Sequence, residues 1–146
     1  MKYFLVLVLS LFVTNSVAQN LNEIKHRDIE VNKNNKINYI EIPAKDIKAT
    51  KVFFSKVFGW SFVDYGPDYC SFGGQGVDGG FFKSDLVVST KNGSPLIVLY
   101  NNSLETTLEI IEKAGGQIVK PIFSFPGGRR FHFSDPNGNE FAVWSE

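Results

Sequence analysis

The sequence has little cysteine and no net charge of either sign. Cys70 is the only cysteine among 146 residues, so no disulfide can form within the chain and the fold must be stable without one. Lys and Arg together number 15, and Asp and Glu also number 15. Nucleic acid and anionic membrane surfaces normally require a strong basic excess, so the composition favours neither as a partner.

The N-terminal apolar run is too short to cross a membrane as a helix. It extends from Tyr3 to Val13, follows a single Lys2 and leads into the small residues Ser16-Val17-Ala18. This layout predicts a signal peptide over residues 1–18, a secreted or periplasmic protein, and no membrane span after cleavage. An uncleaved anchor is the alternative interpretation.

Two regions of different composition follow. Residues 19–36, QNLNEIKHRDIEVNKNNK, are rich in Asn, Lys and acidic residues and have too few apolar residues for a helical stripe. They predict a flexible linker. Residues 37–146 are denser in aromatic residues and glycine, and they predict a single domain.

The first half of this domain, about residues 37–90, begins with the alternating segment INYIEIPAKD, which predicts a strand. Asp46 is expected to cap a helix that Gly59 ends. Three short strands separated by glycine and proline turns are expected between Trp60 and Lys83.

The second half, about residues 91–146, predicts the same order of elements. PLIVLY is a strand, Asn102 and Glu105 form a capping pair for a helix that Gly115-Gly116 ends, and QIVKPIF, GRRFHFS and NEFAVW are strands. When Asp46 is aligned with Asn102, the caps, helix ends and apolar positions of the two halves agree. We therefore expect a duplicated βαβββ unit in which each half needs the other to cover its sheet.

Two segments, IEIPAKDIKATKVFFSKVFGW and GGRRFHFSDPNGNEFAVW, resemble the vicinal oxygen chelate superfamily, which contains glyoxalase I, extradiol dioxygenases and bleomycin resistance proteins. The resemblance implies an α+β fold in which two tandem βαβββ units form curled, mixed sheets around a cup open to small ligands. It also implies a homodimer.

In the enzymes of this superfamily, the first and last strands of each half supply the metal ligands, typically His, Gln or Glu. The resemblance places these positions at Tyr39, at Pro95 or Leu96, within the run Gly79-Gly80-Phe81-Phe82, and at Ala142. Only the phenol of Tyr39 could ligate an ion, whereas a catalytic site generally needs about three protein ligands. We therefore expect no metal cofactor and assign no catalytic residue.

Strand alternation separates an apolar set, expected to face the helices, from a polar set, expected to line the cup. The predicted ligand-binding residues, with Trp60 added as a stacking surface, are Tyr39, Glu41, Trp60, Arg130, His132, Glu140 and Trp144. An ion pair between Arg130 and Glu140 is expected, and its positive charge would oppose a relocated metal site on Glu41, His132 and Glu140.

The sequence thus favours an exported protein that binds an unidentified small molecule in the cup without a metal. Two alternatives remain. One is a metal-dependent lyase or dioxygenase with displaced ligands, and the other is a dimerising interaction module without a ligand.

Overall fold

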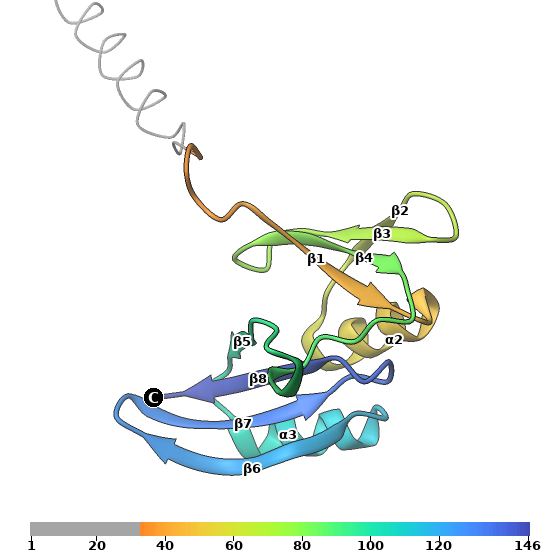
Figure 1. The fold of residues 1–146 in the computed structure, drawn as a ribbon. Coiled ribbons are helices and arrows are strands. Elements are labelled where there is room, and N and C mark those ends of the chain that lie inside the picture. Colours follow the sequence, from red (N-terminus) through yellow and green to blue (C-terminus); the bar gives the residue numbers. More distant parts are fainter. Residues whose placement is uncertain (1–32) are drawn as a thin grey trace, which may run out of the picture. The chain divides into compact units, whose positions relative to one another are not determined.

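The computed structural model describes residues 33–146, of which residues 37–146 form one unit (Figure 1). The predicted signal peptide and most of the predicted linker lie outside the described residues. Within residues 33–146, no helix is long and apolar enough to cross a membrane.

The first half consists of a strand, a helix and three further strands. They are β1 (Tyr39–Ala44), α2 (Ile47–Phe58), β2 (Phe62–Asp64), β3 (Tyr69–Phe72) and β4 (Asp78–Lys83). The strands form one sheet in the order β1-β4-β3-β2, with β1 parallel to β4 and the other pairs antiparallel.

The second half repeats this arrangement. It contains β5 (Ile97–Tyr100), α3 (Leu104–Lys113), β6 (Gln117–Phe125), β7 (Gly128–Ser134) and β8 (Glu140–Ser145), in the sheet order β5-β8-β7-β6. A short 3-10 helix, η1 (Thr90–Asn92), precedes it. The predicted α+β class with two mixed βαβββ sheets is confirmed.

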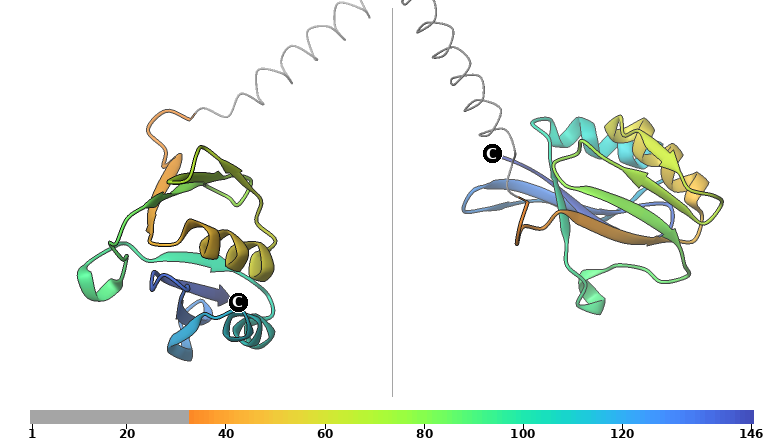
Figure 2. Two further views of the ribbon diagram at one scale, coloured as in Figure 1. Left: turned by 90° about the vertical axis from the view of Figure 1, so that its right-hand side faces the viewer. Right: turned by 90° about the horizontal axis from the view of Figure 1, so that it is seen from above.

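The two helices lie together along one side of the unit and the strands of both sheets along the other (Figure 2). The core fills the space between helices and sheets. Phe54 of α2 is fully buried, and the centroid of its ring lies 5.3 Å from that of Phe81 in the first sheet and 5.2 Å from that of Phe141 in the second. One aromatic side chain therefore packs against both halves.

Helix α2 begins and ends at the predicted residues. The Asp46 carboxylate accepts a hydrogen bond from the Ala49 amide at 2.9 Å, which satisfies a donor that the first turn leaves free. Gly59 has φ +71°, a left-handed conformation that favours glycine over other residues.

The predicted capping pair of the second helix is wrong. Ser103, not Asn102, occupies the N-cap position of α3, and no side chain caps the helix. The Asn101 side-chain oxygen accepts a hydrogen bond from the Ser103 amide, which makes a turn before the helix. The Glu105 carboxylate forms an ion pair at 2.6 Å with the guanidinium of Arg129.

The duplication is confirmed, but the predicted alignment of Asp46 with Asn102 is wrong by one position at the start of each half. The N-cap Asp46 corresponds to Ser103, and Thr50 corresponds to Thr107, because both threonine hydroxyls donate to the carbonyl oxygens of these caps. At the helix ends, Gly59 still corresponds to Gly115, and both glycines have left-handed backbone. The alignment changes within the helices because α3 is shorter than α2.

The turn at residues 135–139 joins the halves as well as closing the β7–β8 hairpin. The buried Asp135 carboxylate accepts hydrogen bonds from the amides of Asn137 and Asn139. The Asn139 side chain donates to the Pro43 carbonyl at 2.7 Å, and the Asn137 side-chain oxygen accepts from the Asp46 amide at 2.7 Å. These bonds fix the start of β8 against the end of β1.

Replacing Phe54 by Ala should destabilise both halves together, because it removes the ring that both sheets contact. We expect a loss of about 3–5 kcal/mol in the free energy of unfolding, measured by urea denaturation with circular dichroism as the readout. Val52→Ala, on the exposed side of the same helix, is the control. Equal losses in the two variants would contradict the shared core.

Candidate functional site

The second sheet presents its predicted apolar and polar sets to opposite sides. Phe131, Phe133, Phe141 and Val143 are fully buried within the core, as predicted. On the other side, Arg130 of β7 lies opposite Trp144 of β8, and His132 lies opposite Ala142. Arg130, His132, Glu140 and Trp144 lie close to three side chains of β6. We call the whole group the second-sheet site: Lys120, Phe123, Phe125, Arg130, His132, Glu140 and Trp144.

Glu140 is the most highly hydrogen-bonded side chain of this site. Its carboxylate accepts from His132 Nδ1 at 2.9 Å, from the Thr90 amide at 2.8 Å, and from the hydroxyls of Ser89 and Thr90. Burial acts to raise the pKa of Glu140, but these hydrogen bonds outweigh it and lower the pKa to about 2. The carboxylate is therefore ionised and holds the imidazole of His132 in a fixed orientation.

The predicted ion pair between Arg130 and Glu140 is wrong. Glu140 lies opposite Ser134, four residues along β7 from Arg130, a separation of about 13 Å at the strand rise of roughly 3.3 Å per residue. Glu140 pairs with His132 instead. Within the part of the chain that the structure describes, no carboxylate pairs with Arg130.

Aromatic rings take the place of a carboxylate around Arg130. Its guanidinium carbon lies 5.1 Å from the ring centroid of Phe123 and 5.4 Å from that of Phe125. Both distances are in the range of cation–π attraction. Trp144 adds a further ring, 6.3 Å from Phe125 between centroids.

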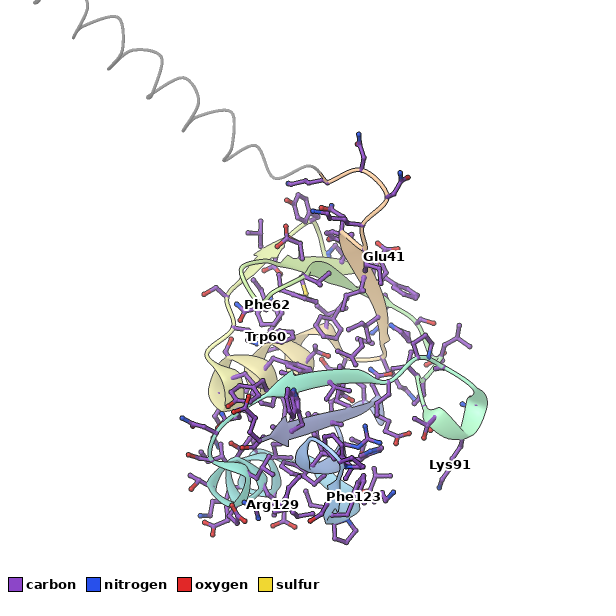
Figure 3. The ribbon with its side chains drawn as sticks, turned by 90° about the vertical axis from the view of Figure 1, so that its left-hand side faces the viewer. Glu41, Trp60, Phe62, Lys91, Phe123 and Arg129 are labelled. Carbon is purple, nitrogen blue, oxygen red and sulfur yellow. The ribbon has the colours of Figure 1, made fainter. Side chains whose placement is uncertain are left out.

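Tyr39 and Glu41 lie on the first sheet and form a separate cluster with Tyr69. The hydroxyls of Tyr39 and Tyr69 are 2.6 Å apart, and Tyr69 donates to Glu41 at 3.2 Å. Burial, together with the bonds to Tyr39 and Glu41, raises the pKa of Tyr69. No hydrogen bond or ring contact among residues 33–146 joins this cluster to the second-sheet site, and Glu41 and Phe123 lie on different sheets in Figure 3.

Trp60 lies apart from both groups of residues. It is 7 % exposed and packs in the core with ring centroids 4.7 Å from Phe54 and 4.7 Å from Phe72. Figure 3 shows it with Phe62 in the interior, below the first sheet. Trp60 also lines a cleft of about 880 Å³ with Ile40, Leu96 and Leu99. The structure therefore does not bring Trp60 together with the other predicted site residues.

The strand register identifies the fourth metal-ligand position that the sequence left open. Glu41 pairs with Gly80 in the first sheet. Val98, which corresponds to Glu41 when the caps Asp46 and Ser103 are aligned, pairs with Ala142 in the second. Gly80 is therefore the counterpart of Ala142. A Cβ atom at Gly80 would lie 2.1 Å from the Tyr69 hydroxyl, so the Tyr69 ring occupies the space that a ligating side chain would need.

The residues at the four positions do not fit a metal ion of the kind that the superfamily's enzymes hold. Glycine and alanine have no donor atom in their side chains, and the same is true of Leu96, the counterpart of Tyr39. Across residues 33–146, no three His, Cys, Asp or Glu side chains come close enough together to hold an ion. The relocated set of Glu41, His132 and Glu140, which the sequence disfavoured, does not come together, since Glu41 belongs to the first-sheet cluster and Glu140 is bonded to His132, Ser89 and Thr90.

Paired βαβββ units of this geometry define a class of α+β proteins. The model of the Glyoxalase/Bleomycin resistance protein/Dioxygenase superfamily matches residues 36–143, and the chain belongs to this superfamily. No curated protein matches the chain.

Solved structures confirm the fold. A glyoxalase-related enzyme from Fulvimarina pelagi is 19% identical with TM-score 0.64, over 75% of this chain and 87% of that one. The genomically encoded fosfomycin resistance protein FosX from Listeria monocytogenes is 17% identical with TM-score 0.62, over 75% and 91%. A mutant of that protein, 17% identical with TM-score 0.62 over 76% and 89%, was crystallised with Mn(II) and 1S,2S-dihydroxypropylphosphonic acid.

Sequence reasoning missed several residues that shape these clusters. On β3, Cys70 and Phe72 are buried and Tyr69 lies on the opposite face. This alternation of buried and less buried residues could have predicted that Tyr69 faces the cup. Phe123 and Phe125 were hidden because β6 shifts register between Ile118 and Phe123. Ser89 and Thr90 reach Glu140 from a loop far away in the sequence, and no local signal indicates this contact.

The low pKa of Glu140 predicts a pH-dependent contribution to stability. A carboxyl whose folded-state pKa is lowered stabilises the fold above its unfolded pKa, and this contribution is lost as pH falls through the folded value. Between about pH 5 and pH 2 the loss should be about 3 kcal/mol. Glu140→Gln should therefore lie furthest below the wild type at pH 7, in urea unfolding, and approach it as pH falls.

Glu109→Gln is the matched control, because Glu109 is exposed and, among residues 33–146, pairs only with Lys113 one helical turn away. A gap between wild type and Glu140→Gln that stays constant from pH 7 to pH 3 would refute the assignment.

Proposed function

We propose that this protein is exported and binds a small molecule at the second-sheet site without the help of a metal ion. One observation carries the proposal. The last-strand positions that would supply metal ligands are Gly80 and Ala142, and the Tyr69 ring fills the space above Gly80. A site of this fold that lacks the metal must bind through its side chains alone.

The second-sheet site has the properties expected of a binding surface. His132 is oriented by Glu140, and Arg130 is held against Phe123 and Phe125. Side chains that are already ordered lose little conformational entropy when a ligand arrives, so they favour binding. The role would parallel that of the bleomycin resistance proteins, which sequester a small molecule without converting it.

Export and pairing belong to the same proposal. The predicted signal peptide supports export, and the superfamily supports a homodimer. The first-sheet cluster of Tyr39, Glu41 and Tyr69 is then a second polar surface, which a partner copy or the ligand could meet.

The competing function is that of a metal-dependent lyase or dioxygenase with displaced ligands, which the Mn(II) complex of the Listeria protein favours. Elemental analysis of protein purified without chelator separates the two. We expect far less than one transition-metal ion per chain after dialysis. About one Zn, Ni, Mn or Fe per chain would overturn the proposal, and His132→Ala should then abolish both metal and turnover.

A thermal-shift screen in the presence of a chelator tests the binding itself. Small compounds that bind the folded state raise the melting temperature through mass action. We expect stabilisers that act equally well with and without chelator. A screen that finds none would favour the third alternative, a dimerising interaction module.

The predicted export has its own measurement. Expressed in a bacterium with a secretory pathway, the full chain should yield a mature protein whose N-terminal residue is Gln19, determined by mass spectrometry. Protein that keeps Met1 and stays in the cytoplasm would contradict export.

A further inference from the structure

The charge of the second-sheet site is not balanced within the site. Arg130 is half-buried, and its Nε atom is enclosed by protein with no hydrogen-bond partner among residues 33–146. A guanidinium in such surroundings loses hydration and gains only cation–π attraction from Phe123 and Phe125 in return. The two Nη atoms of the guanidinium are not enclosed in this way, so an anion beside them would supply hydrogen bonds and the missing opposite charge.

A second cation approaches the same ring. Lys120 Nζ lies 3.8 Å from the centroid of Phe123, on the strand next to Arg130. The only carboxylate of the site is Glu140, and His132, Ser89 and Thr90 occupy its oxygens. Lys120 and Arg130 therefore leave the β6–β7 side of the site positive.

His132 adds a further polar atom beside these cations. The ionised carboxylate of Glu140 can only accept a hydrogen bond, so Nδ1 of His132 carries a proton and donates it. The other nitrogen, Nε2, is enclosed without a partner among the described residues, and the whole residue is only 7 % exposed. Arg130 and His132, which lie on the same face of β7, thus each contain one enclosed nitrogen without a partner among the described residues.

The rest of the site is aromatic. Phe125 and Tyr100 both contact Trp144, with ring centroids at 6.3 Å and 5.2 Å, and Phe123 lies 5.9 Å from the imidazole of His132. The register shifts of β6 fall on either side of Lys120, where an irregular strand can re-aim its side chains. Flat apolar surfaces therefore border the positive group.

We infer that the ligand is a small molecule with a planar apolar body and an anionic group. Arg130 and Lys120 receive the anion, His132 lies beside it, and Phe123, Phe125 and Trp144 contact the body. This inference rests on the proposed binding function and narrows its ligand class.

Benzoate and benzamide form a matched pair of probes, because they share the ring and differ in the charge of one group. Each is titrated into the full-length mature protein labelled with ¹⁵N, and amide shifts on β6, β7 and β8 report binding. We expect benzoate to bind about tenfold more tightly than benzamide, because charge-assisted hydrogen bonds are roughly twice as strong as neutral ones, and a difference of about 1.4 kcal/mol is tenfold in affinity. Arg130→Gln should remove this preference, and Lys120→Gln should reduce it.

Arg129→Gln is the control, because Arg129 lies on the same strand but pairs with Glu105 on the helix side. It should leave the preference unchanged. Two results would overturn the inference that the ligand is anionic. One is equal affinity for the two probes, and the other is a preference for benzoate that survives Arg130→Gln in a protein with an otherwise wild-type spectrum. Neither result would contradict the binding of a small molecule. Absence of amide shifts with both probes would also overturn the anionic ligand class. The proposed binding function would be contradicted as well only if the thermal-shift screen found no stabiliser.

Discussion

The ring of Phe54 contacts both sheets, and the arrangement of the site depends on this shared core. Its contacts with Phe81 and Phe141 require the apolar residues of β4 and β8 to face the helices. Successive residues of a strand point to opposite sides, so a slip of one residue would exchange the two faces. The core therefore determines that Arg130, His132 and Trp144 lie together on the face of the second sheet that is turned away from the helices. The bonds of Asn137 and Asn139 to the first half hold the start of β8 in that register.

The same register explains why the fold persists here without the usual ligand set. Gly80 and Ala142 are small residues that fit the packing at their positions. Gly80 leaves space for the Tyr69 ring, and Ala142 lies opposite His132. Tyr69 in turn bonds to Tyr39 and Glu41. Polar groups that could have faced an ion are thus bonded to one another. The second sheet differs, because Arg130 and His132 keep nitrogen atoms without partners among the described residues.

Much of the fold could be predicted from the sequence, because its signals are local. Asp46, Gly59 and the alternation of β7 and β8 identify α2 and the hairpin, and the repeat identifies the second half. The cap of α3 was misplaced by one position because Asn101, Asn102 and Ser103 all have side chains suited to a turn or a cap. The sequence repeat could not show the change of alignment within the helices.

The site was less accessible to sequence reasoning, because its decisive contacts join distant segments. Alternation assigned Arg130, His132, Glu140 and Trp144 to one face, which the strand register supports. It could not show that Glu140 is bonded by the loop at Ser89 and Thr90, nor that Arg130 lies against rings of β6 instead of a carboxylate. Trp60 was assigned to the cup because aromatic residues suit stacking, but its neighbours Phe54 and Phe72 hold it in the core.

The central claim is that this member of the superfamily binds its ligand through side chains alone. The most direct test compares the dissociation constant of benzoate in the presence of a chelator with that in the presence of added Mn(II). The account predicts the same value in both conditions, because Arg130 and Lys120 receive the anion and no ion takes part. Binding that appears only with Mn(II), or that strengthens by about tenfold or more, the equivalent of roughly 1.4 kcal/mol, would contradict it.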